Sequence, residues 1–445
     1  MKMLSERIAG SEDKSASALR LASFGRIMPA NMAATTPAIK RKASIEDLEE
    51  LGARATQVID EARRLSLEPE NKKTLRTFSM SEMCQLLDLH PTAYYDLIRT
   101  NPEFEGNKVE RNRLFTLHEI HQMQGFLKKL PRQRYAIERA ITISVANFKG
   151  GVAKTFTAVT LAQYLAMRGY RTLVIDTDPQ ASLTSSFGLD SNDVSDFHTI
   201  LPYLYGRREV ERMGETWPES FKSTIQPTYW SGLDIVAANL TLYTGEFILG
   251  LRRELARDTD EPFEFHRPLA DALEDVRGDY DVIVIDNPPA LSLSTTGAIF
   301  AADGLILPTP AETLDFESAR AFMRLAAEIL KAVRSSFGTN KELEIFRILI
   351  TRFAELPSHK KIANRILDVF GDWAIQEPMV TSEAVRKIGV NWKTLYEEDP
   401  RGKGRGVLKR AVDAANTVNG LIEADIIDVF REWREKRQGN SRVAA

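Results

Sequence analysis

The sequence has one cysteine in 445 residues, Cys84. A single thiol cannot form an intrachain disulfide, a cysteine-rich zinc site or an iron–sulfur cluster, so the sequence predicts a protein of a reducing cytoplasm. Cys84 itself is expected to be a small buried hydrophobic residue. The sequence also lacks the run of about 18 apolar residues that a membrane-spanning helix needs, and the segment after Met1 does not resemble a signal peptide.

Neither sign of charge dominates the chain. The formal net charge is -3, which excludes a wholly basic protein that coats nucleic acid. Residues 1–140 hold 23 Lys and Arg against 19 Asp and Glu, so the remainder carries about -7. This mild asymmetry permits a DNA-binding region near the N-terminus without requiring one.

The first seventy residues predict a leader and a helix. Residues 1–42 are rich in Ala, Ser, Lys and Arg without sustained periodicity, which indicates a mobile leader. In residues 43–70, the stretch SIEDLEELGARATQVIDEARRL places apolar residues three and four positions apart, from Ile45 to Ile59. We expect a helix that packs or dimerises, and a free solvated helix is the alternative.

Residues 71–138 predict a helix-turn-helix with a wing. Ser79 or Ser81 can cap a short helix, and a second helix begins with Pro91 in its first turn. The second helix of such a pair can enter the major groove of DNA, whereas a helical hairpin that does not bind DNA is the alternative. NKVERNRLFTLHEIHQMQ then indicates a basic hairpin that leads into another helix. The expected DNA-facing residues are Tyr94, Tyr95, Arg99, Arg111 and Arg113.

Residues 139–440 predict an α/β domain with a mostly parallel sheet covered by helices. Short runs rich in Val, Ile and Leu alternate with helix-like segments, as a sheet buried on both faces requires. The runs are ITISVAN, RTLVID, LDIVAA, DVIVID, GLILPT and IFRILIT. Near the end, GLIEADIIDVFREWREKR indicates an amphipathic helix.

A deviant phosphate-binding loop follows the first of these strands. In VANFKGGVAKTFTAV, Phe148 and Ala153 occupy the glycine positions of the usual pattern G-x-x-x-x-G-K-[ST]. Gly150 and Gly151 still allow the backbone to approach a phosphate, and a helix that begins at the lysine favours an anion. A negative φ would accommodate the Ala153 methyl group, and a positive φ would strain the loop.

Acidic residues end two further strands. VIDTDPQAS places Asp176 and Asp178, and VIVIDNPPA places Asp286, at the carboxyl edge of the sheet where ligands bind in open α/β folds. One such aspartate is often a helix cap, but three behind a phosphate loop indicate a magnesium–nucleotide site. A second lysine, Lys149, gives the loop the form K-G-G-x-x-K-T, although a solvated loop cation is the alternative reading.

This two-lysine loop resembles the deviant Walker A motif of ParA/MinD ATPases. The resemblance spans residues 141 to about 435 through KGGVAKT, DTDPQAS, DNPPA and ILPTP. It is strongest for the larger plasmid-partition ParA proteins with an N-terminal helix-turn-helix, and within them for the RepA partition proteins of repABC plasmids. The latter resemblance is carried by LAQYLAMRGYRTLVIDTDPQASL, TYWSGLDIVAANLTLY and WKTLYEEDPR.

The resemblance implies a bacterial, nucleoid-associated segregation ATPase with slow basal turnover of ATP to ADP. It further implies a nucleotide-sandwich homodimer, binding to non-specific DNA, stimulation by a ParB-type (RepB-like) partner, and autorepression through operator DNA.

The resemblance also implies roles for individual residues, each matched by its position in the family's motifs. Lys149 matches the lysine that reaches the partner's phosphates, Lys154 the phosphate lysine, and Asp178 the acid that positions the attacking water. The magnesium-side residues are Thr155, Asp176 and Asp286. The nucleotide contacts are Lys149, Gly150, Gly151, Val152, Ala153, Lys154, Thr155 and Phe156, with Pro310, Thr351 and Arg352 near the adenine. The chain departs from the family at Ala153 and Asn287, and the former predicts slow turnover.

A basic segment near the C-terminus is the expected site for non-specific DNA, which needs cations near phosphates rather than base readout. Its cations are Arg386, Lys387, Lys393, Arg401, Lys403 and Arg405. Glu397, Glu398 and Asp399 interrupt it, so a plain solvated loop is the alternative. Two other function classes are a MinD-like membrane-cycling ATPase and a metabolic enzyme on the same fold. The acidic residues of the last helix disfavour the first, and the second leaves the helix-turn-helix unexplained.

Overall fold

The structure is a computed structural model that describes residues 44–67, 73–110, 112–256, 263–381, 393–401 and 405–443. The chain divides into two compact units, Met1–Ala62 and Arg63–Ala445. The expected leader, residues 1–42, lies outside the described residues. The predicted helix after it is confirmed as α2 (Ile45–Leu67), on which Ile45, Leu48, Leu51, Val58 and Ile59 are exposed.

A seven-stranded sheet organises the second unit, and its strand order is β10-β9-β4-β8-β5-β7-β6. All six predicted strands are present and pair in parallel, and a short antiparallel edge strand, β6, was not predicted. The strands are β4 (Ile141–Val145), β5 (Thr172–Asp176), β6 (Gln226–Pro227), β7 (Leu233–Val236), β8 (Val282–Asp286), β9 (Gly304–Pro310) and β10 (Ile345–Thr351).

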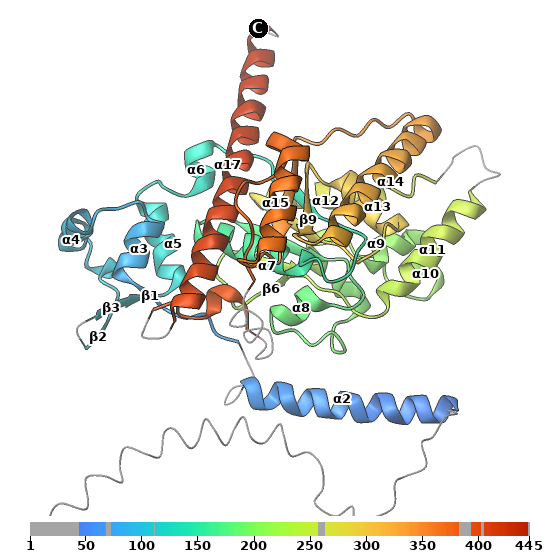
Figure 1. Cartoon of the computed structure of the whole chain (residues 1–445), viewed down its shortest axis with the longest axis horizontal. Helices are drawn as coiled ribbons and strands as arrows, with labels where there is room; N and C mark the ends of the chain where they lie inside the picture. Colours follow the sequence, from blue (N-terminus) through green and yellow to red (C-terminus); the bar gives the residue numbers. More distant parts are fainter. Residues whose placement is uncertain are drawn as a thin grey trace, which may run out of the picture. The chain divides into compact units, whose positions relative to one another are not determined.

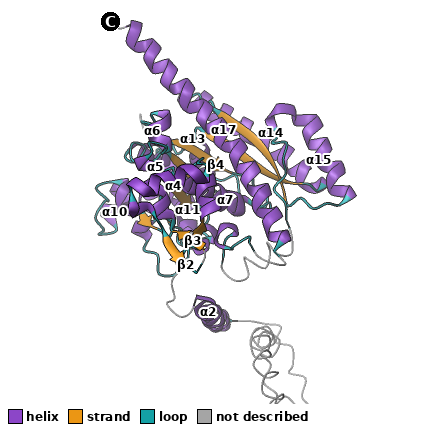
Figure 2. Cartoon of the chain, turned by 90° about the vertical axis from the view of Figure 1, so that its left-hand side faces the viewer, coloured by secondary structure: helices purple, strands orange, loops and turns teal. Residues whose placement is uncertain are grey.

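Helices cover both faces of this sheet (Figures 1 and 2). The helices are α7 (Lys154–Met167), α8 (Ser182–Ser186), α9 (Leu201–Tyr205), α10 (Arg207–Arg212), α11 (Leu242–Leu255), α12 (Pro268–Glu274), α13 (Leu293–Ala301), α14 (Thr313–Phe337), α15 (Pro357–Phe370) and α17 (Gly406–Val443). Short 3₁₀ turns are η2 (Asp196–His198), η3 (Phe221–Thr224), η4 (Gly371–Trp373) and η5 (Leu395–Glu397). The predicted C-terminal helix is confirmed and begins earlier than expected.

Alternation along the strands explains the two covered faces. Val282 and Val284 of β8 pack in one apolar cluster with α7 and α17, whereas Ile283 and Ile285 pack in another with α9, α11 and α12. Successive side chains of a strand point to opposite faces, so a strand with helices on both sides has to be apolar throughout. A third cluster packs α14 and α15 on β9 and β10.

The segment before the sheet forms a small module of helices around a three-stranded sheet. Its elements are β1 (Phe78–Ser79), α3 (Met80–Leu86), α4 (Pro91–Thr100), η1 (Pro102–Phe104), β2 (Asn107–Val109), β3 (Asn112–Phe115), α5 (Leu117–Phe126) and α6 (Pro131–Tyr135). Ser79 is the N-cap of α3 and forms a capping box with Glu82, and Pro91 begins α4, as predicted. The predicted hairpin is β2–β3.

This module shares a core with the large sheet. Phe78, Cys84 and Tyr94 belong to the same buried apolar cluster as α7 and α17, and Cys84 is buried as expected. The ring Nε2 of His121 lies 2.8 Å from the carbonyl oxygen of Ala166 in α7. Figure 1 shows the module beside α17. The module therefore has a fixed position relative to the helix that follows the glycine loop.

Candidate nucleotide site

The strand order brings the predicted site residues to one edge. β8 lies between β4 and β5, and in register Val145 pairs with Asp286, which also pairs with Asp176. The carboxyl ends of these three strands therefore place the glycine loop and both strand-end acids side by side. The parallel topology thus brings Asp286 next to residues that lie more than a hundred positions earlier in the sequence.

The loop between β4 and α7 contains two residues in the left-handed conformation, one on each side of Val152. Gly151 has φ +73°, and Ala153 has φ +70°. The positive φ at Ala153 is the strained alternative of the two that the sequence left open. A left-handed conformation costs an alanine about 1–2 kcal/mol relative to its usual conformation.

Lys154 begins α7 and its side chain is buried, with 7% of the residue exposed. Its Nζ donates to the carbonyl oxygen of Lys149 at 3.2 Å. Burial lowers the pKa of Lys154, and the charges of Asp286 and Asp178 partly oppose this shift. A buried ammonium at a helix N-terminus behind a glycine loop is suited to a phosphate group.

Asp286 is fully buried, and neither carboxylate oxygen has a hydrogen-bond partner among the described residues. Burial raises the pKa of Asp286 well above its usual value, and the neighbouring Asp176 adds to the shift, while Thr155 and Lys154 oppose it. An orphaned carboxylate beside a threonine hydroxyl fits an Mg²⁺ ion, which prefers oxygen ligands and keeps several waters.

Asp176 has a different environment. Its Oδ1 accepts from the backbone N–H of Asp178 at 3.1 Å, and its Oδ2 accepts from the N–H and hydroxyl of Thr184 at 2.9 and 2.8 Å. Burial nevertheless raises its pKa to about 7. These bonds give Asp176 a structural role at the start of α8, and direct binding to magnesium stays a prediction.

Asp178 lies at the same edge with 9% of the residue exposed. Its Oδ1 accepts from the N–H of Gln180, which leaves Oδ2 for another donor, such as water. Among the described residues no group of three His, Cys, Asp or Glu side chains could hold a metal by itself. A magnesium ion at this edge would therefore depend on phosphate oxygens and water as well as on protein.

Lys149 forms an ion pair with the helix that follows β9. Its Nζ lies 2.5 Å from Oδ1 of Asp315 in the first turn of α14, and 37% of its side chain is exposed. The sequence analysis missed Asp315 because it lies far along the chain and follows no recognisable spacing. Its only sequence signal is its place five residues after the end of the ILPTP run.

Thr351, the last residue of β10, and Arg352, which follows it, both donate hydrogen bonds to the glycine loop. The hydroxyl of Thr351 donates to the carbonyl oxygen of Val152 at 2.9 Å, and Nη1 of Arg352 donates to that of Gly151 at 3.0 Å. Pro310 is buried at the end of β9 beside them. The predicted contact of these three residues with adenine stays a prediction.

Asn287, where the chain departs from the family pattern, binds protein groups. Its Nδ2 donates to the hydroxyl of Ser144 at 2.8 Å and to the carbonyl oxygen of Val145 at 3.1 Å. Both acceptors belong to β4. The amide therefore fixes the strand from which the glycine loop departs.

Known proteins resemble this chain over most of its length. A family model described as an AAA domain matches residues 140–345. A candidate replication protein A from Sinorhizobium fredii (strain NBRC 101917 / NGR234) is 32% identical over 381 residues, which cover 83% of this chain and 89% of the relative. Protein SopA from Escherichia coli (strain K12) is 30% identical over 346 residues, which cover 74% and 83%.

The chain belongs to the plasmid-partition ParA/SopA family of ATPases. A solved structure of a partition protein has the same fold, with a TM-score of 0.54 and 20% identity over 84% of this chain and 99% of its own. No helix among the described residues has the length and apolar character needed to cross a membrane.

The DNA-facing residues expected in this ParA/SopA-family chain are only partly exposed. The expectation that Tyr94 lies on the outward face of α4 is wrong, because Tyr94 is fully buried. Its hydroxyl donates to the carbonyl oxygen of Glu105 at 2.8 Å, and its ring meets Phe115 edge-on. Tyr95 and Arg99 are exposed, and Arg113 is held by Glu105 at 2.6 Å.

The C-terminal cations that the structure describes are interleaved with acids. Lys393 and Arg405 both pair with Glu398, and Arg401 pairs with Asp399. The signs are therefore mixed along this segment. Four expected DNA contacts lie outside the described residues, namely Arg111, Arg386, Lys387 and Lys403.

Proposed function

We propose that this chain is an ATP-dependent partition ATPase. It binds ATP, and ADP after hydrolysis, together with Mg²⁺ at the carboxyl edge of β4, β5 and β8. The observation that carries the proposal is a buried lysine, Lys154, whose charge interacts with that of Asp286, a fully buried acid with no hydrogen-bond partner among the described residues. Lys154 would bind phosphate oxygens, and Thr155 and Asp286 would hold the ion directly or through water. Magnesium would supply charge neutralisation during phosphoryl transfer, and Asp178 would orient the attacking water.

The proposal includes a homodimer with two shared nucleotides. Lys149 supports it, since this half-exposed cation lies on the same loop and is free to turn toward a second molecule once it leaves Asp315. The helix α2 carries exposed apolar side chains, which suits a dimerisation helix. The domain divisions at residues 43–70, 71–138 and 139–440 follow from this assignment.

DNA is the other proposed partner. α3 and α4 with the β2–β3 hairpin support a winged helix-turn-helix that binds operator DNA and represses the chain's own operon. Tyr95 and Arg99 are the exposed α4 residues that would reach DNA. A ParB-type, RepB-like protein would stimulate hydrolysis, and the dimer would act on non-specific DNA of the bacterial nucleoid.

ATP hydrolysis by the full-length chain tests the proposal, with and without duplex DNA. Lys154→Ala should abolish hydrolysis and weaken nucleotide binding, because it removes the buried phosphate-binding charge. Lys331→Ala is the matched control, since Lys331 is exposed on α14 and far along the chain from the loop. A Lys154→Ala variant that hydrolyses ATP at the parent's rate would refute the mechanism.

A further inference from the structure

The helix α11 has an exposed apolar face. Apolar residues three or four positions apart lie on it, and between 51% and 79% of each residue is exposed. They are Leu240, just before the helix, and Tyr243, Phe247, Leu251 and Leu255. This spacing places the five side chains in one row along the helix, and Figure 1 shows α11 on the outside of the large sheet's helical layers. An exposed apolar row of this kind is typical of an interaction surface.

The opposite face of α11 holds the helix in place. Leu242 and Leu249 are buried in the apolar cluster that includes α9 and α12. Gly245 lies between them, and a Cβ atom there would lie 2.7 Å from a side-chain atom of Leu204 in α9. The two helices are therefore closely packed, and the position of α11 does not depend on its exposed row.

The first turns of α11 contact both loops that carry acids of the nucleotide site. Nε2 of Gln180 donates to the hydroxyl of Tyr243 at 2.9 Å, and the N–H of Gln180 donates to Oδ1 of Asp178 at 2.9 Å. The carboxylate of Glu246 accepts from two backbone N–H groups at the start of α13, at 3.1 and 2.9 Å. Because α13 follows the loop after β8, a displacement of α11 would reach both loops.

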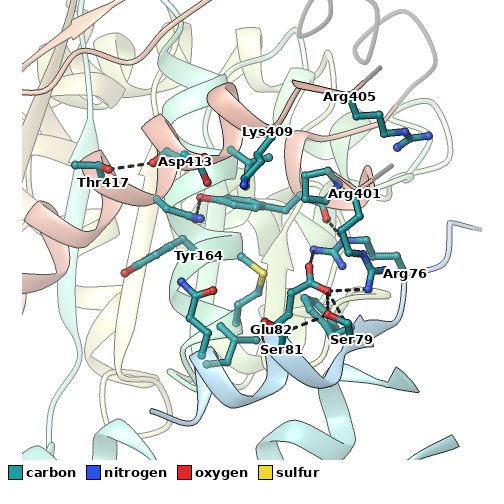
Figure 3. Close-up of a pocket in the computed structure, with 18 of the residues that line it drawn as sticks. Arg76, Ser79, Ser81, Glu82, Tyr164, Arg401, Arg405, Lys409, Asp413 and Thr417 are labelled. Carbon is teal, nitrogen blue, oxygen red and sulfur yellow. Dashed lines mark hydrogen bonds and ion pairs between the residues drawn. The ribbon is translucent and has the colours of Figure 1, made fainter. Parts of the chain in front are cut away.

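The groove of 760 Å³ between α3 and the start of α17 has a different character (Figure 3). Four of its five cations are held in ion pairs, which join the module, α7 and the C-terminal segment. The pairs are Arg76 and Arg401 with Glu82, Arg168 with Glu423, and Arg405 with Glu398. The charges of that groove are therefore largely satisfied within the chain. The row on α11 is apolar instead, so its burial against another molecule would be favourable.

The size of the row indicates the kind of partner that it fits. A standard interface between two proteins takes about 20–30 residues from each side. Five residues on one helix are too few to hold a second copy of this chain. An amphipathic helix needs only anchors at intervals of three and four residues along such a row. The 14 residues of α11 span about 20 Å, which matches about four turns of a docked helix.

We propose that α11 is the docking site for an amphipathic helix of the protein that stimulates hydrolysis, and that Tyr243 relays docking to Gln180 and Asp178. This inference rests on the stimulation proposed above and adds the surface and the route. Phe247 is the most exposed residue of the row and is its central anchor. Tyr243 is a positioning residue, since it acts through Gln180.

ATP hydrolysis by the full chain tests the docking site, with Mg²⁺, duplex DNA and increasing amounts of the purified RepB-like protein. Phe247→Ala should raise the half-stimulating concentration about tenfold, because it removes the apolar anchor. Leu325→Ala, at an exposed position of α14, should leave that concentration unchanged. If the parent is not stimulated, the proposed stimulation fails. If the parent is stimulated and Phe247→Ala responds alike, only the docking site is refuted.

Tyr243→Phe separates docking from its effect on the nucleotide site. It keeps the ring in the row but removes the hydroxyl that accepts from Gln180. The maximal stimulated rate should fall about fivefold, the loss expected for one hydrogen bond, while the half-stimulating concentration stays that of the parent. Tyr205→Phe removes a hydroxyl of α9 that lies 2.6 Å from Thr244 of α11, and it should leave the maximal rate unchanged. A maximal rate of Tyr243→Phe equal to the parent's would overturn the route through Gln180.

Cross-linking tests where the partner lies. A Cβ atom at Gly250 of α11 or at Gly278 would meet no atom within 4 Å, so cysteines at the two positions form a matched pair. A photo-cross-linker on Gly250→Cys should capture the RepB-like protein, lose it when Phe247→Ala is added, and exceed the yield from Gly278→Cys. Equal yields at both positions would overturn the proposal. Capture of a second copy of the chain in place of the RepB-like protein would also overturn it, because α11 would then be a dimer contact.

Discussion

Lys149 and Asp315 form an ion pair of 2.5 Å between the glycine loop and the first turn of α14. Asp315 is buried, with 6% of its side chain exposed. Lys149 cannot keep this partner and also bind the phosphate of a second molecule. In the proposed homodimer the pair would hold the lysine back until a competing anion arrives, and it would oppose dimerisation.

Asp315→Asn should remove that opposition. A partly exposed ion pair contributes about 0.5–1 kcal/mol, so the ATP concentration that half-saturates dimer formation should fall about two- to fivefold. Analytical ultracentrifugation across an ATP series measures this. Asp368→Asn, at an exposed position of α15, is the matched control. A dimer of Asp315→Asn that forms only at higher ATP than the parent would show that the pair supports the active state instead.

Substituting glycine for the loop residue Ala153 should have the opposite effect on stability from the same substitution inside a helix. Its φ of +70° suits glycine, so Ala153→Gly should stabilise the chain by about 1 kcal/mol. Ala327→Gly, at an exposed position inside α14, should destabilise it by about 1 kcal/mol. Denaturant unfolding of the two variants gives both free energies. Destabilisation by Ala153→Gly would mean that the loop gains nothing from glycine.

The same variant addresses turnover. If the strain at Ala153 slows a loop movement, Ala153→Gly should raise the rate of ATP hydrolysis along with stability. The slow turnover expected from the sequence would then have a physical cause in a single methyl group.

The hydrogen bond between Thr351 and the glycine loop gives a third prediction. The hydroxyl of Thr351 donates to the carbonyl oxygen of Val152, and Thr351→Val removes this bond without changing the side chain's shape. A buried hydrogen bond contributes about 1 kcal/mol, and an acceptor left without a donor costs a similar amount. We expect affinity for ADP with Mg²⁺ to fall about fivefold, as measured by calorimetry.

Thr309→Val provides the control on the neighbouring strand. Thr309 is equally buried, but its hydroxyl donates within β9, to the carbonyl oxygen of Leu307 at 3.3 Å. It should therefore leave nucleotide affinity unchanged. Equal losses from the two variants would show that the effect comes from the core rather than from the loop.

Sequence patterns predicted the parts of the fold that depend on local periodicity. The buried strands were recognisable because Val282 to Ile285 is apolar throughout, and the site followed because parallel strands end at the same edge. The caps at Ser79 and Pro91 were likewise local signals. These features need no knowledge of distant contacts.

Long-range pairs could not be predicted in the same way. Tyr94 and Tyr95 are adjacent and identical in type, so only the packing of Phe115 decides which one is buried. Asp315 meets Lys149 only because β9 delivers α14 to the loop. The sign of φ at Ala153 likewise depends on the loop's closure, and composition does not reveal it.

The last prediction concerns a buried ion pair that links the segment before β1 to η5. Nζ of Lys73 lies 3.2 Å from Oε1 of Glu397, and each side chain is 5% exposed. Lys73 also donates to the carbonyl oxygen of Ser186 at 2.6 Å, at the end of α8. The hydroxyl of Tyr229 donates to Glu397 as well.

Glu397→Gln keeps the shape of this side chain but leaves the Lys73 charge buried beside a neutral amide. Removing one partner of a buried pair costs about 3–5 kcal/mol, and the retained amide oxygen should reduce this to about 2–3 kcal/mol. Denaturant unfolding measures the loss. Glu377→Gln, at an exposed position, should change stability by less than about 0.5 kcal/mol. If Glu397→Gln were equally mild, Lys73 would be solvated in solution, and the module would not be anchored to α8 through this contact.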